Sequence, residues 1–312
     1  MYSISLAQDI SQTQLPKIMP TFESLVALFI QSKDIRRSSL RVYEVSFAQF
    51  HAYLQSVGSA YPREQDVKSF KQHLIDKQLS PFTISAYIAA LKSLFSFLAN
   101  RNLYPNIARE INVPKKPKGF MKDSLTKKQA QDLLSAAQGP DVTSKRDYAI
   151  LSTLVRCGLR SIELIRANIE DIRQSSGIPV LYVQGKGCDA KDEFVVLTEG
   201  ALSALNLYLA ARGKLKPSDP LFASHGPRNN DGRLTTRSIS RLVKQYMAKI
   251  NLTSDRLTCH SLRHTFATLA LMNNAPLLAL QEAMRHANIN TTTMYTHMQD
   301  RLTKGAEYFI DL

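Results

Sequence analysis

A seven-residue segment rich in proline and lysine divides this 312-residue chain into two parts. Residues 113–119 read VPKKPKG, and neither proline can sit inside a helix. The lysines keep such a segment in water or against an anion. We therefore predict a linker at 113–119, preceded by an N-terminal segment at 1–20 and a helical domain at 21–112, and followed by a second domain at 120–312.

The first part has apolar residues at helical spacing from residue 21 to residue 109, which predicts a bundle of four helices. Serine caps, a proline in the first turn and a terminal glycine mark where two of these helices begin and end. The expected boundaries are Ser38 or Ser39 to Gly58, and Ser80–Pro81 to Asn100.

The second part is expected to be mainly helical with one small sheet. Helical patterns at 126–138 and 145–157 precede two β-branched or aromatic runs, 180–183 and 194–197, which flank a Gly-Lys-Gly turn at 185–187. This pattern predicts an antiparallel hairpin. Helices are expected again after the hairpin. The fold class is therefore mainly α, with an N-terminal helical bundle and a mainly α second domain that contains a small antiparallel β-sheet.

The charge of the chain is strongly positive and spread over both parts. The chain has 40 Lys and Arg against 26 Asp and Glu, a net charge of +14. Residues 1–118 carry 15 basic and 8 acidic side chains, and the remaining residues carry 25 and 18. A net positive charge distributed over two folded parts is typical of a protein that binds a polyanion from two sides, with nucleic acid as the first candidate. An anionic membrane is less suitable, because no polybasic amphipathic helix is present.

The remaining composition favours a cytoplasmic protein without a cofactor. The first residues lack a basic start followed by an apolar run, and the longest aliphatic runs are far below the ~18 residues that span a bilayer. Three widely spaced cysteines, Cys157, Cys188 and Cys259, suggest neither disulfides nor a zinc site. No phosphate-binding glycine loop and no Gly-x-Ser-x-Gly nucleophile motif is found.

Three segments of the second part concentrate basic and polar residues. Gly158 is expected to end a helix, which places Arg160 near the start of the next helix with Glu163 on the same face. In the run 260–268, HSLRHTFAT, His260 and Arg263 share a face. His260 and His264 are also four apart, but Arg263 between them would repel a cation, so we assign no metal.

The third segment, 284–297, contains a histidine and a tyrosine that a turn can bring together. His286 and Tyr295 would be ~13 Å apart on an unbroken helix. Turn signals at Asn288 and Asn290 allow the chain to fold back between them. Both side chains can then meet.

Together these segments resemble the tyrosine recombinases of the phage integrase family. The resemblance covers the chain from about residue 21 to its end. It rests on CGLRSIEL at 157–164, the hairpin lysine in Gly-Lys-Gly, the run 260–268, a histidine 286 − 263 = 23 residues after its arginine, and a tyrosine 295 − 286 = 9 residues further on. The compact two-domain recombinases are the best match, since only about twenty residues precede the first expected helix.

The resemblance implies a set of catalytic residues. These are Arg160, Lys186, His260, Arg263, His286 and the nucleophile Tyr295, with Glu163 at the acidic accessory position. Two guanidiniums can meet the negative charge that grows on a phosphodiester when a phenol attacks it. The phenol needs a proton acceptor, for which His260 is the candidate, and His286 would hold a phosphate oxygen. Lys186 on the hairpin would protonate the leaving 5′-oxygen.

This set implies a site-specific recombinase that cleaves and rejoins DNA through a 3′-phosphotyrosyl intermediate, without ATP or metal, to integrate, excise or resolve DNA elements. Two alternatives stay open. The first is a relaxing enzyme similar to type IB topoisomerases, and the second is a DNA-binding regulator without catalysis.

The expected partner is double-stranded DNA with paired half-sites, bound by a homo-oligomer that is a tetramer on DNA. Accessory proteins are an open class of partner, and no cofactor or membrane is implied. Basic residues near a helix start, in the linker and along one later helix are the candidates for DNA contact, against the alternative of a solvated charged face. They are Arg36, Arg37, Arg41, Lys115, Lys116, Arg237, Arg241 and Lys244.

Two positions depart from the family pattern. The family usually has Leu-Gly-His ahead of the nucleophile, where this chain has Met284-Arg285-His286, so that a large cation replaces glycine. Arg285 could contact phosphate or point to solvent. Lys191, also in the hairpin region, is a rival to Lys186 as the proton donor.

Overall fold

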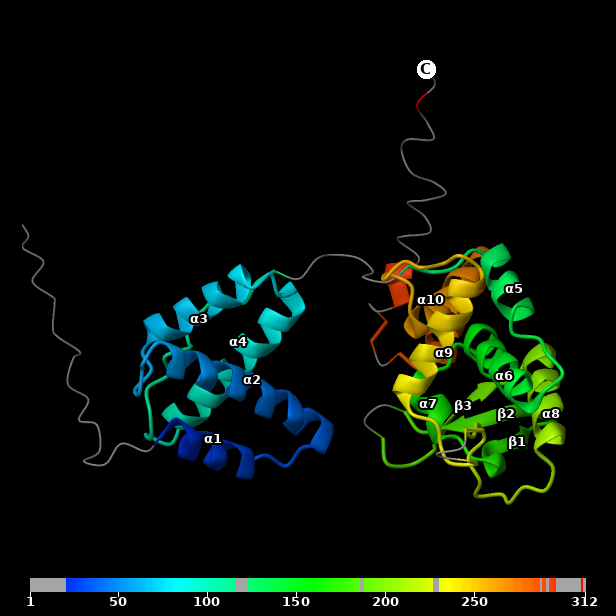
Figure 1. Ribbon diagram of the computed structural model, residues 1–312, viewed down its shortest axis with the longest axis horizontal. Helices are drawn as coiled ribbons and strands as arrows, with labels where there is room; N and C mark the ends of the chain where they lie inside the picture. The colour runs from blue at the N-terminus through cyan, green and yellow to red at the C-terminus, as the bar shows by residue number, and fades with distance from the viewer. Residues whose placement is uncertain are drawn as a thin grey trace, which may run out of the picture. The chain divides into compact units, whose positions relative to one another are not determined.

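The structure is a computed structural model that describes residues 21–115, 123–185, 188–226, 230–286, 288–289, 292–295 and 310. The chain divides into two compact units, Met1–Lys118 and Gly119–Leu312 (Figure 1). The division falls within the predicted linker. Each unit has its own hydrophobic core, as expected for independent domains.

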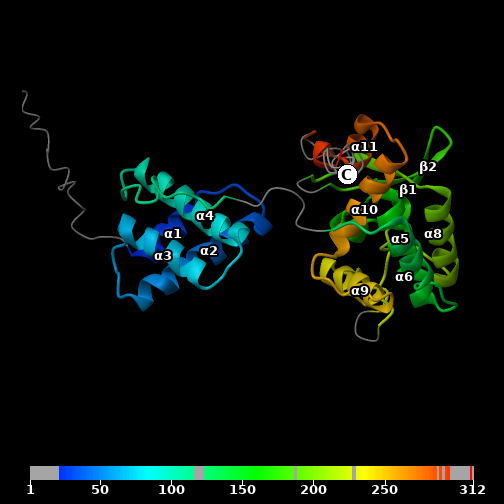
Figure 2. The same ribbon diagram turned by 90° about the horizontal axis from the view of Figure 1, so that it is seen from above.

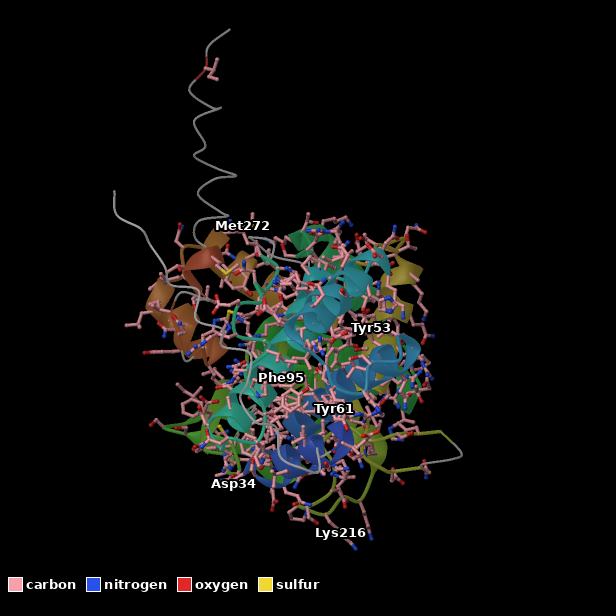
Figure 3. The ribbon with its side chains drawn as sticks, turned by 90° about the vertical axis from the view of Figure 1, so that its left-hand side faces the viewer. Asp34, Tyr53, Tyr61, Phe95, Lys216 and Met272 are labelled. Carbon is pink, nitrogen blue, oxygen red and sulfur yellow. The ribbon has the colours of Figure 1, made fainter. Side chains whose placement is uncertain are left out.

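The described part of the first unit is a bundle of helices, as predicted. Its helices are α1 (Phe22–Gln31), α2 (Arg37–Ser56), α3 (Glu64–Asp76) and α4 (Pro81–Ala99). Helix α4 contacts each of the other three. Phenylalanines fill the centre, where Phe50 of α2 meets Phe70 edge to face at 5.0 Å between ring centroids and lies 6.5 Å from Phe95. Figure 3 shows Phe95 among the side chains of this unit.

Local capping explains most of the helix boundaries in this unit. Ser80 caps α4 by accepting a hydrogen bond from the Thr83 amide, Pro81 occupies the first turn, and Asn100 is the C-cap, as predicted. Gly58, with a φ of +66°, follows the end of α2. The predicted serine start of α2 is wrong. Arg36 is the N-cap, because its backbone is extended and its carbonyl already accepts from the Ser39 and Leu40 amides.

Helix α4 is long and apolar enough to cross a membrane by length and composition alone. Eight of its residues are buried in the first unit, where they pack against the neighbouring helices. A central helix that is contacted on several sides is expected to be apolar on most of its surface. Core packing therefore accounts for the composition of α4.

The second unit is mainly helical with one sheet. Its elements are α5 (Lys127–Ser135), α6 (Val142–Cys157), α7 (Ser161–Arg166), the 3₁₀ turn η1 (Ile169–Asp171), β1 (Ile172–Ser175), β2 (Ile178–Val183), β3 (Glu193–Val196), α8 (Glu199–Arg212), α9 (Thr236–Lys249), α10 (Cys259–Met272) and α11 (Leu277–Met284). Helix α6 runs through the core and contacts α5, α7, α8 and α10. Figure 2 shows α11 beside α10, at the end of the unit that carries the candidate site.

The sheet is antiparallel with the order β1-β2-β3. The predicted hairpin is confirmed, with Val180 opposite Val196 and Tyr182 opposite Phe194. Strand β1 was not predicted, because its sequence IRQS lacks the apolar content of a typical strand. It pairs with β2 across a two-residue turn at Ser176 and Gly177, both with positive φ, which is the geometry of a type I′ hairpin turn.

Candidate active site

Arg160 is positioned by the end of α6 and the start of α7. Gly158 ends α6 with a φ of +61°, and a Cβ atom there would lie 2.5 Å from the Phe266 ring of α10. Arg160 is then the N-cap of α7, and its amide donates to Glu163 Oε2 at 2.8 Å. Its guanidinium donates to Glu163 Oε1 at 2.6 Å and to the Arg285 carbonyl at 2.9 Å. The predicted shared face of Arg160 and Glu163 is therefore present, with Glu163 accepting from the Arg160 amide at the helix start and forming an ion pair with its guanidinium.

Arg263 is a deeply buried cation of the site. It lies on α10, is 1% exposed, and donates to the carbonyls of Gly158, at 2.6 Å, and Met284. Its Nη1 atom also lies 4.0 Å from Glu163 Oε2. Burial, together with the charges of Arg160 and Arg285, lowers its pKa to about 9, which leaves it a cation at neutral pH. Arg263 thus ties the end of α6 to the end of α11.

The side chain of Arg285 is turned away from solvent and pairs with a buried carboxylate. It is the C-cap of α11 in the left-handed conformation, with φ 52° and ψ 51°. Its Nη2 donates to Glu163 Oε2 at 2.6 Å, with side chains that are 4% and 0% exposed. Burial acts to raise the pKa of Glu163, but the charges of Arg285 and Arg160 and the Arg160 amide outweigh it, so this pKa is lowered. Glu163 is therefore an ionised group that binds the guanidiniums of Arg285 and Arg160 and lies near that of Arg263.

The Tyr295 hydroxyl lies 2.5 Å from Nδ1 of His264. Tyr295 is 3% exposed and packs against Ala267, Leu280 and Met284 of α10 and α11. His260, the candidate acceptor from the sequence, is exposed in the first turn of α10 with its ring 4.5 Å from that of His264. Sequence reasoning considered His264 only as a metal ligand. Its spacing of four from His260 was the signal that both rings share one face of α10.

His286 follows α11 directly, next to Arg285. Its Nδ1 lies 2.9 Å from Thr292 Oγ1, and the Ile289 carbonyl between them accepts from the Thr292 amide at 2.7 Å. Burial and the charges of Arg263, Arg160 and Arg285 lower the pKa of His286 to about 4. A neutral imidazole held by Thr292 can donate a hydrogen bond from its other nitrogen.

The lysine of the hairpin turn, Lys186, lies outside the described residues. Its rival Lys191 pairs with the carboxylate of Asp171, whose side chain is 2% exposed. A lysine bound to a buried carboxylate has a structural role and is not placed to give up a proton. This contact favours Lys186 over Lys191 as the proton donor.

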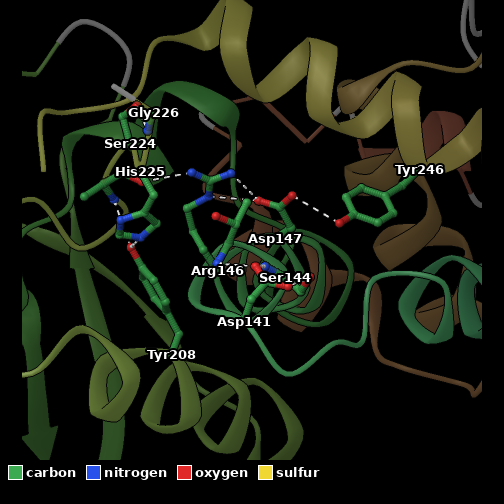
Figure 4. Close-up of polar contacts among 11 residues, drawn as sticks. Asp141, Ser144, Arg146, Asp147, Tyr208, Ser224, His225, Gly226 and Tyr246 are labelled. Carbon is green, nitrogen blue, oxygen red and sulfur yellow. Dashed lines mark hydrogen bonds and ion pairs between the residues drawn. The ribbon is translucent and has the colours of Figure 1, made fainter. Parts of the chain in front are cut away.

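Two other tyrosines of the second unit serve its core. The Tyr246 hydroxyl of α9 donates to Asp147 Oδ2 at 3.1 Å, and Asp147 also pairs with Arg146 at 2.6 Å. The Tyr208 hydroxyl of α8 lies 3.1 Å from His225 Nε2 (Figure 4). The Tyr246 contact holds the start of α6 against α9, and the Tyr208 contact holds α8 against the segment that contains His225. Both phenols are therefore engaged in packing, whereas a third phenol, Tyr308, lies outside the described residues.

The residues predicted to contact DNA are mostly exposed. In the first unit, Arg36, Arg37 and Arg41 lie exposed at the start of α2, and Lys115 is exposed, while Lys116 lies outside the described residues. Arg237 and Arg241 are exposed on α9. Lys244 differs, because its Nζ donates to the Ser254 carbonyl at 2.9 Å and lies 3.6 Å from Asp255. That contact gives Lys244 a role in holding the turn after α9.

A cavity of about 1170 Å³ opens beside the site. Arg160, Arg285 and His286 line one side of it. Phe194 and Val196 of β3 also line the cavity, and both are exposed. The cavity therefore joins the cationic site to an apolar surface.

Comparisons with known proteins match both units of the chain to one family. Residues 123–301 match the phage integrase family, and residues 23–102 match the phage integrase N-terminal SAM-like domain. The chain is 33% identical to the tyrosine recombinase XerD of Halalkalibacterium halodurans over 241 residues, which are 75% of this chain and 77% of that protein. It is 34% identical to the tyrosine recombinase XerC of Thermodesulfovibrio yellowstonii over 236 residues, with 74% and 76% covered.

Solved structures share the fold. The XerH site-specific recombinase bound to palindromic difH substrate, in a post-cleavage complex, has a TM-score of 0.73 and 22% identity, with 92% of this chain and 84% of that chain covered. The Tn1549 transposon integrase in complex with transposon right end DNA has a TM-score of 0.71 and 19% identity, with 91% and 100% covered.

Proposed function

Because this chain belongs to the phage integrase family of tyrosine recombinases, which are DNA strand transferases, we propose that it performs site-specific recombination with Tyr295 as the nucleophile. The observation that carries this assignment is the tie between Arg263 and two distant carbonyls. The carbonyls of Gly158 and Met284 both accept from its guanidinium. These two bonds hold the start of α7 with Arg160, helix α10 and the segment that carries Tyr295 close together. Such convergence of remote cations and a phenol suits phosphoryl transfer.

In the proposed cleavage step, the Tyr295 oxygen forms a bond to phosphorus while the bond from phosphorus to the 5′-oxygen breaks. Arg160 and Arg263 stabilise the charge on the non-bridging oxygens, and His286 donates to one of them. Lys186 gives a proton to the leaving 5′-oxygen, and the proton of Tyr295 passes to a base or to water. The phosphotyrosyl ester keeps the energy of the phosphodiester, so a second 5′-hydroxyl can reverse the step without ATP.

We propose paired half-sites in double-stranded DNA as the substrate. The relatives of known structure include recombinases bound to difH and to transposon end DNA. In this chain, the exposed arginines of α2 and α9 supply cations on both units, in keeping with the even charge distribution. The working form is a homo-oligomer, a tetramer on two sites, in which the C-terminal segment of one protomer binds its neighbour. The cavity with Phe194 and Val196 is a suitable receptor for the apolar side chains of that segment.

The test of the proposed nucleophile is the formation of a covalent adduct between the protein and the cleaved DNA strand. A binding site is first selected from random duplexes with the purified chain, and a nicked version then traps the cleaved strand on the protein. Tyr295→Phe is expected to abolish the adduct and to leave affinity in gel shifts nearly unchanged, since no cation is removed. Tyr246→Phe is the matched control, which keeps the adduct. An adduct in the Tyr295→Phe protein would refute the nucleophile, and no adduct in the parent chain would favour a DNA-binding regulator.

The same substrates separate recombination from relaxation. A recombinase joins the cleaved strand to a second site and needs paired half-sites. A relaxing enzyme similar to type IB topoisomerases would remove supercoils from plasmids that lack the selected site. We expect strand exchange between two sites and no relaxation of such plasmids.

A further inference from the structure

The contact between His264 and Tyr295 has two opposite chemical interpretations. His264 could take the proton of the nucleophile, or it could hold the nucleophile away from DNA. The 2.5 Å separation suits either role. Burial is the first discriminating fact, because Tyr295 is 3% exposed and His264 is 7% exposed. A phosphate of a DNA duplex must reach the phenol oxygen, and a phenol enclosed between α10 and α11 has to move before it can attack.

The pKa shifts of Tyr295 and His264 also favour a role in holding the phenol over a role in taking its proton. Burial raises the pKa of Tyr295 to about 12, although Arg263 acts to lower it. Burial and the charges of His260, Arg263 and His286 lower the pKa of His264 to about 4. A phenol whose pKa is raised and an imidazole whose pKa is lowered both oppose transfer of the proton from Tyr295 to His264. The surrounding cations therefore make His264 a poor base for this phenol in the described position.

The tautomer of His264 does not alter this conclusion. With its proton on Nε2, the ring accepts a hydrogen bond from the neutral phenol at Nδ1. With its proton on Nδ1, the ring donates to the phenol oxygen and cannot take up the phenol proton at that atom. In the first case the contact stabilises the neutral phenol, and in the second Nδ1 already carries a proton, so that neither tautomer makes transfer of the phenol proton to His264 favourable in the described position.

We propose that His264 is a positioning residue that holds Tyr295 in a buried resting position, and that the hydroxyl leaves His264 before it attacks DNA. This inference rests on the proposed role of Tyr295 as the nucleophile. The contact closes a small apolar cluster of Ala267, Leu280 and Met284 around the ring. Release of the ring therefore requires that the segment after α11 separates from α10, which is an event that DNA binding or a neighbouring protomer can drive.

Chemical nitration of tyrosines, read by mass spectrometry, tests the resting position directly. The full chain provides its own references, because Tyr61 is 53% exposed and Tyr246 is 5% exposed. In the free chain Tyr295 should be protected like Tyr246. In His264→Leu the hydroxyl loses the hydrogen bond to His264 in a buried site, and nitration of Tyr295 should rise about tenfold while Tyr61 and Tyr246 stay unchanged. His264→Asn, which keeps a polar atom close to Nδ1, should restore most of the protection.

Cleavage kinetics separate holding from proton transfer. On a nicked duplex with one half-site, a holding role predicts that His264→Leu forms the adduct faster than the parent, by about tenfold, with unchanged affinity. A base role predicts the reverse, with slower adduct formation on one and on two half-sites. Slower cleavage in His264→Leu, or equal nitration of Tyr295 in the parent and the variant, would overturn the proposal.

A folding failure of the leucine variant would leave a decisive measurement on the parent chain. Tyr295 should be protected when the chain is free and should become reactive on a duplex with paired half-sites. Equal reactivity in the two states would contradict a buried resting position. The nucleophile assignment is judged separately, since it stands or falls on the adduct of Tyr295→Phe.

Discussion

Replacing Arg285 by glycine should destabilise the second unit, although glycine is the residue that its backbone conformation favours. The left-handed conformation at φ 52° costs a residue with a side chain about 1 kcal/mol, and glycine would recover this amount. Against this gain stands the ion pair with Glu163, whose side chain is 0% exposed. Breaking a buried pair by removing one partner costs about 3 to 5 kcal/mol. Since Arg160 still faces Glu163, we take the lower figure and expect a net loss of about 2 kcal/mol.

Calorimetric unfolding of the full chain measures this loss, with Arg285→Ala as the matched control. Alanine loses the same ion pair but keeps the unfavourable backbone conformation, so it should be less stable than glycine by about 1 kcal/mol. A glycine variant as stable as the parent would refute the reasoning, and so would a glycine variant less stable than the alanine variant.

The pH dependence gives a second check on the same pair. The pKa of Glu163 is lowered in the folded chain, so its pairing stabilises the fold above the unfolded value near ~4.3 and this stabilisation is lost as the pH falls through the folded pKa. The stability difference between the parent and Arg285→Gly should therefore be full at neutral pH and shrink in acid. A difference that stays constant through this range would show that the ion pair is not its origin.

Three further predictions concern cleavage and assembly. Arg160→Ala and Arg263→Ala should each slow single-turnover cleavage by about 100-fold with smaller effects on binding, and cleavage by the parent should persist in EDTA. Lys186→Ala should impair cleavage, and a substrate with a 5′-bridging sulfur should restore it, because the thiolate leaves without a proton. Lys191→Ala should cleave normally but unfold more easily, since it leaves Asp171 buried without its lysine. Truncation after Thr303 should preserve binding to one half-site and abolish cooperative binding to two in gel-shift titrations, and unchanged cooperativity would contradict exchange of this segment.

Local sequence signals predicted the parts of the fold that depend on neighbouring residues. Gly158 lies at a helix end, where glycine is common, and Glu163 lies in the first turn of the next helix, where a carboxylate can accept from the backbone amide of the N-cap residue Arg160. The hairpin could be predicted for the same reason, since its strands are β-branched or aromatic runs close to each other in the chain. Strand β1 could not, because its pairing with β2 depends on the turn more than on its own residues.

The contacts that decide the chemistry of the site were not predictable, because they join residues far apart in the chain. The sequence left two alternatives for Arg285, contact with phosphate or exposure to solvent. Its partner in the structure, Glu163, lies 122 residues earlier in the chain. His264 lies 31 residues before Tyr295, and nothing in the spacing indicates which histidine of α10 would face the phenol. Both contacts follow from the packing of α10 and α11, which brings the end of α11 next to the start of α7.

The backbone carbonyls at the end of α11 link DNA binding to the position of the nucleophile. Met284 and Arg285 accept from Arg263 and Arg160, which are the cations proposed to bind phosphate. A phosphate that takes over these donors competes with the two carbonyls, because a guanidinium has a fixed number of N–H groups. The segment that begins at Arg285 and carries Tyr295 would then lose part of its attachment to α7 and α10. Binding of the substrate would thereby weaken the restraint on the phenol, so that Tyr295 becomes available where a phosphodiester is already held.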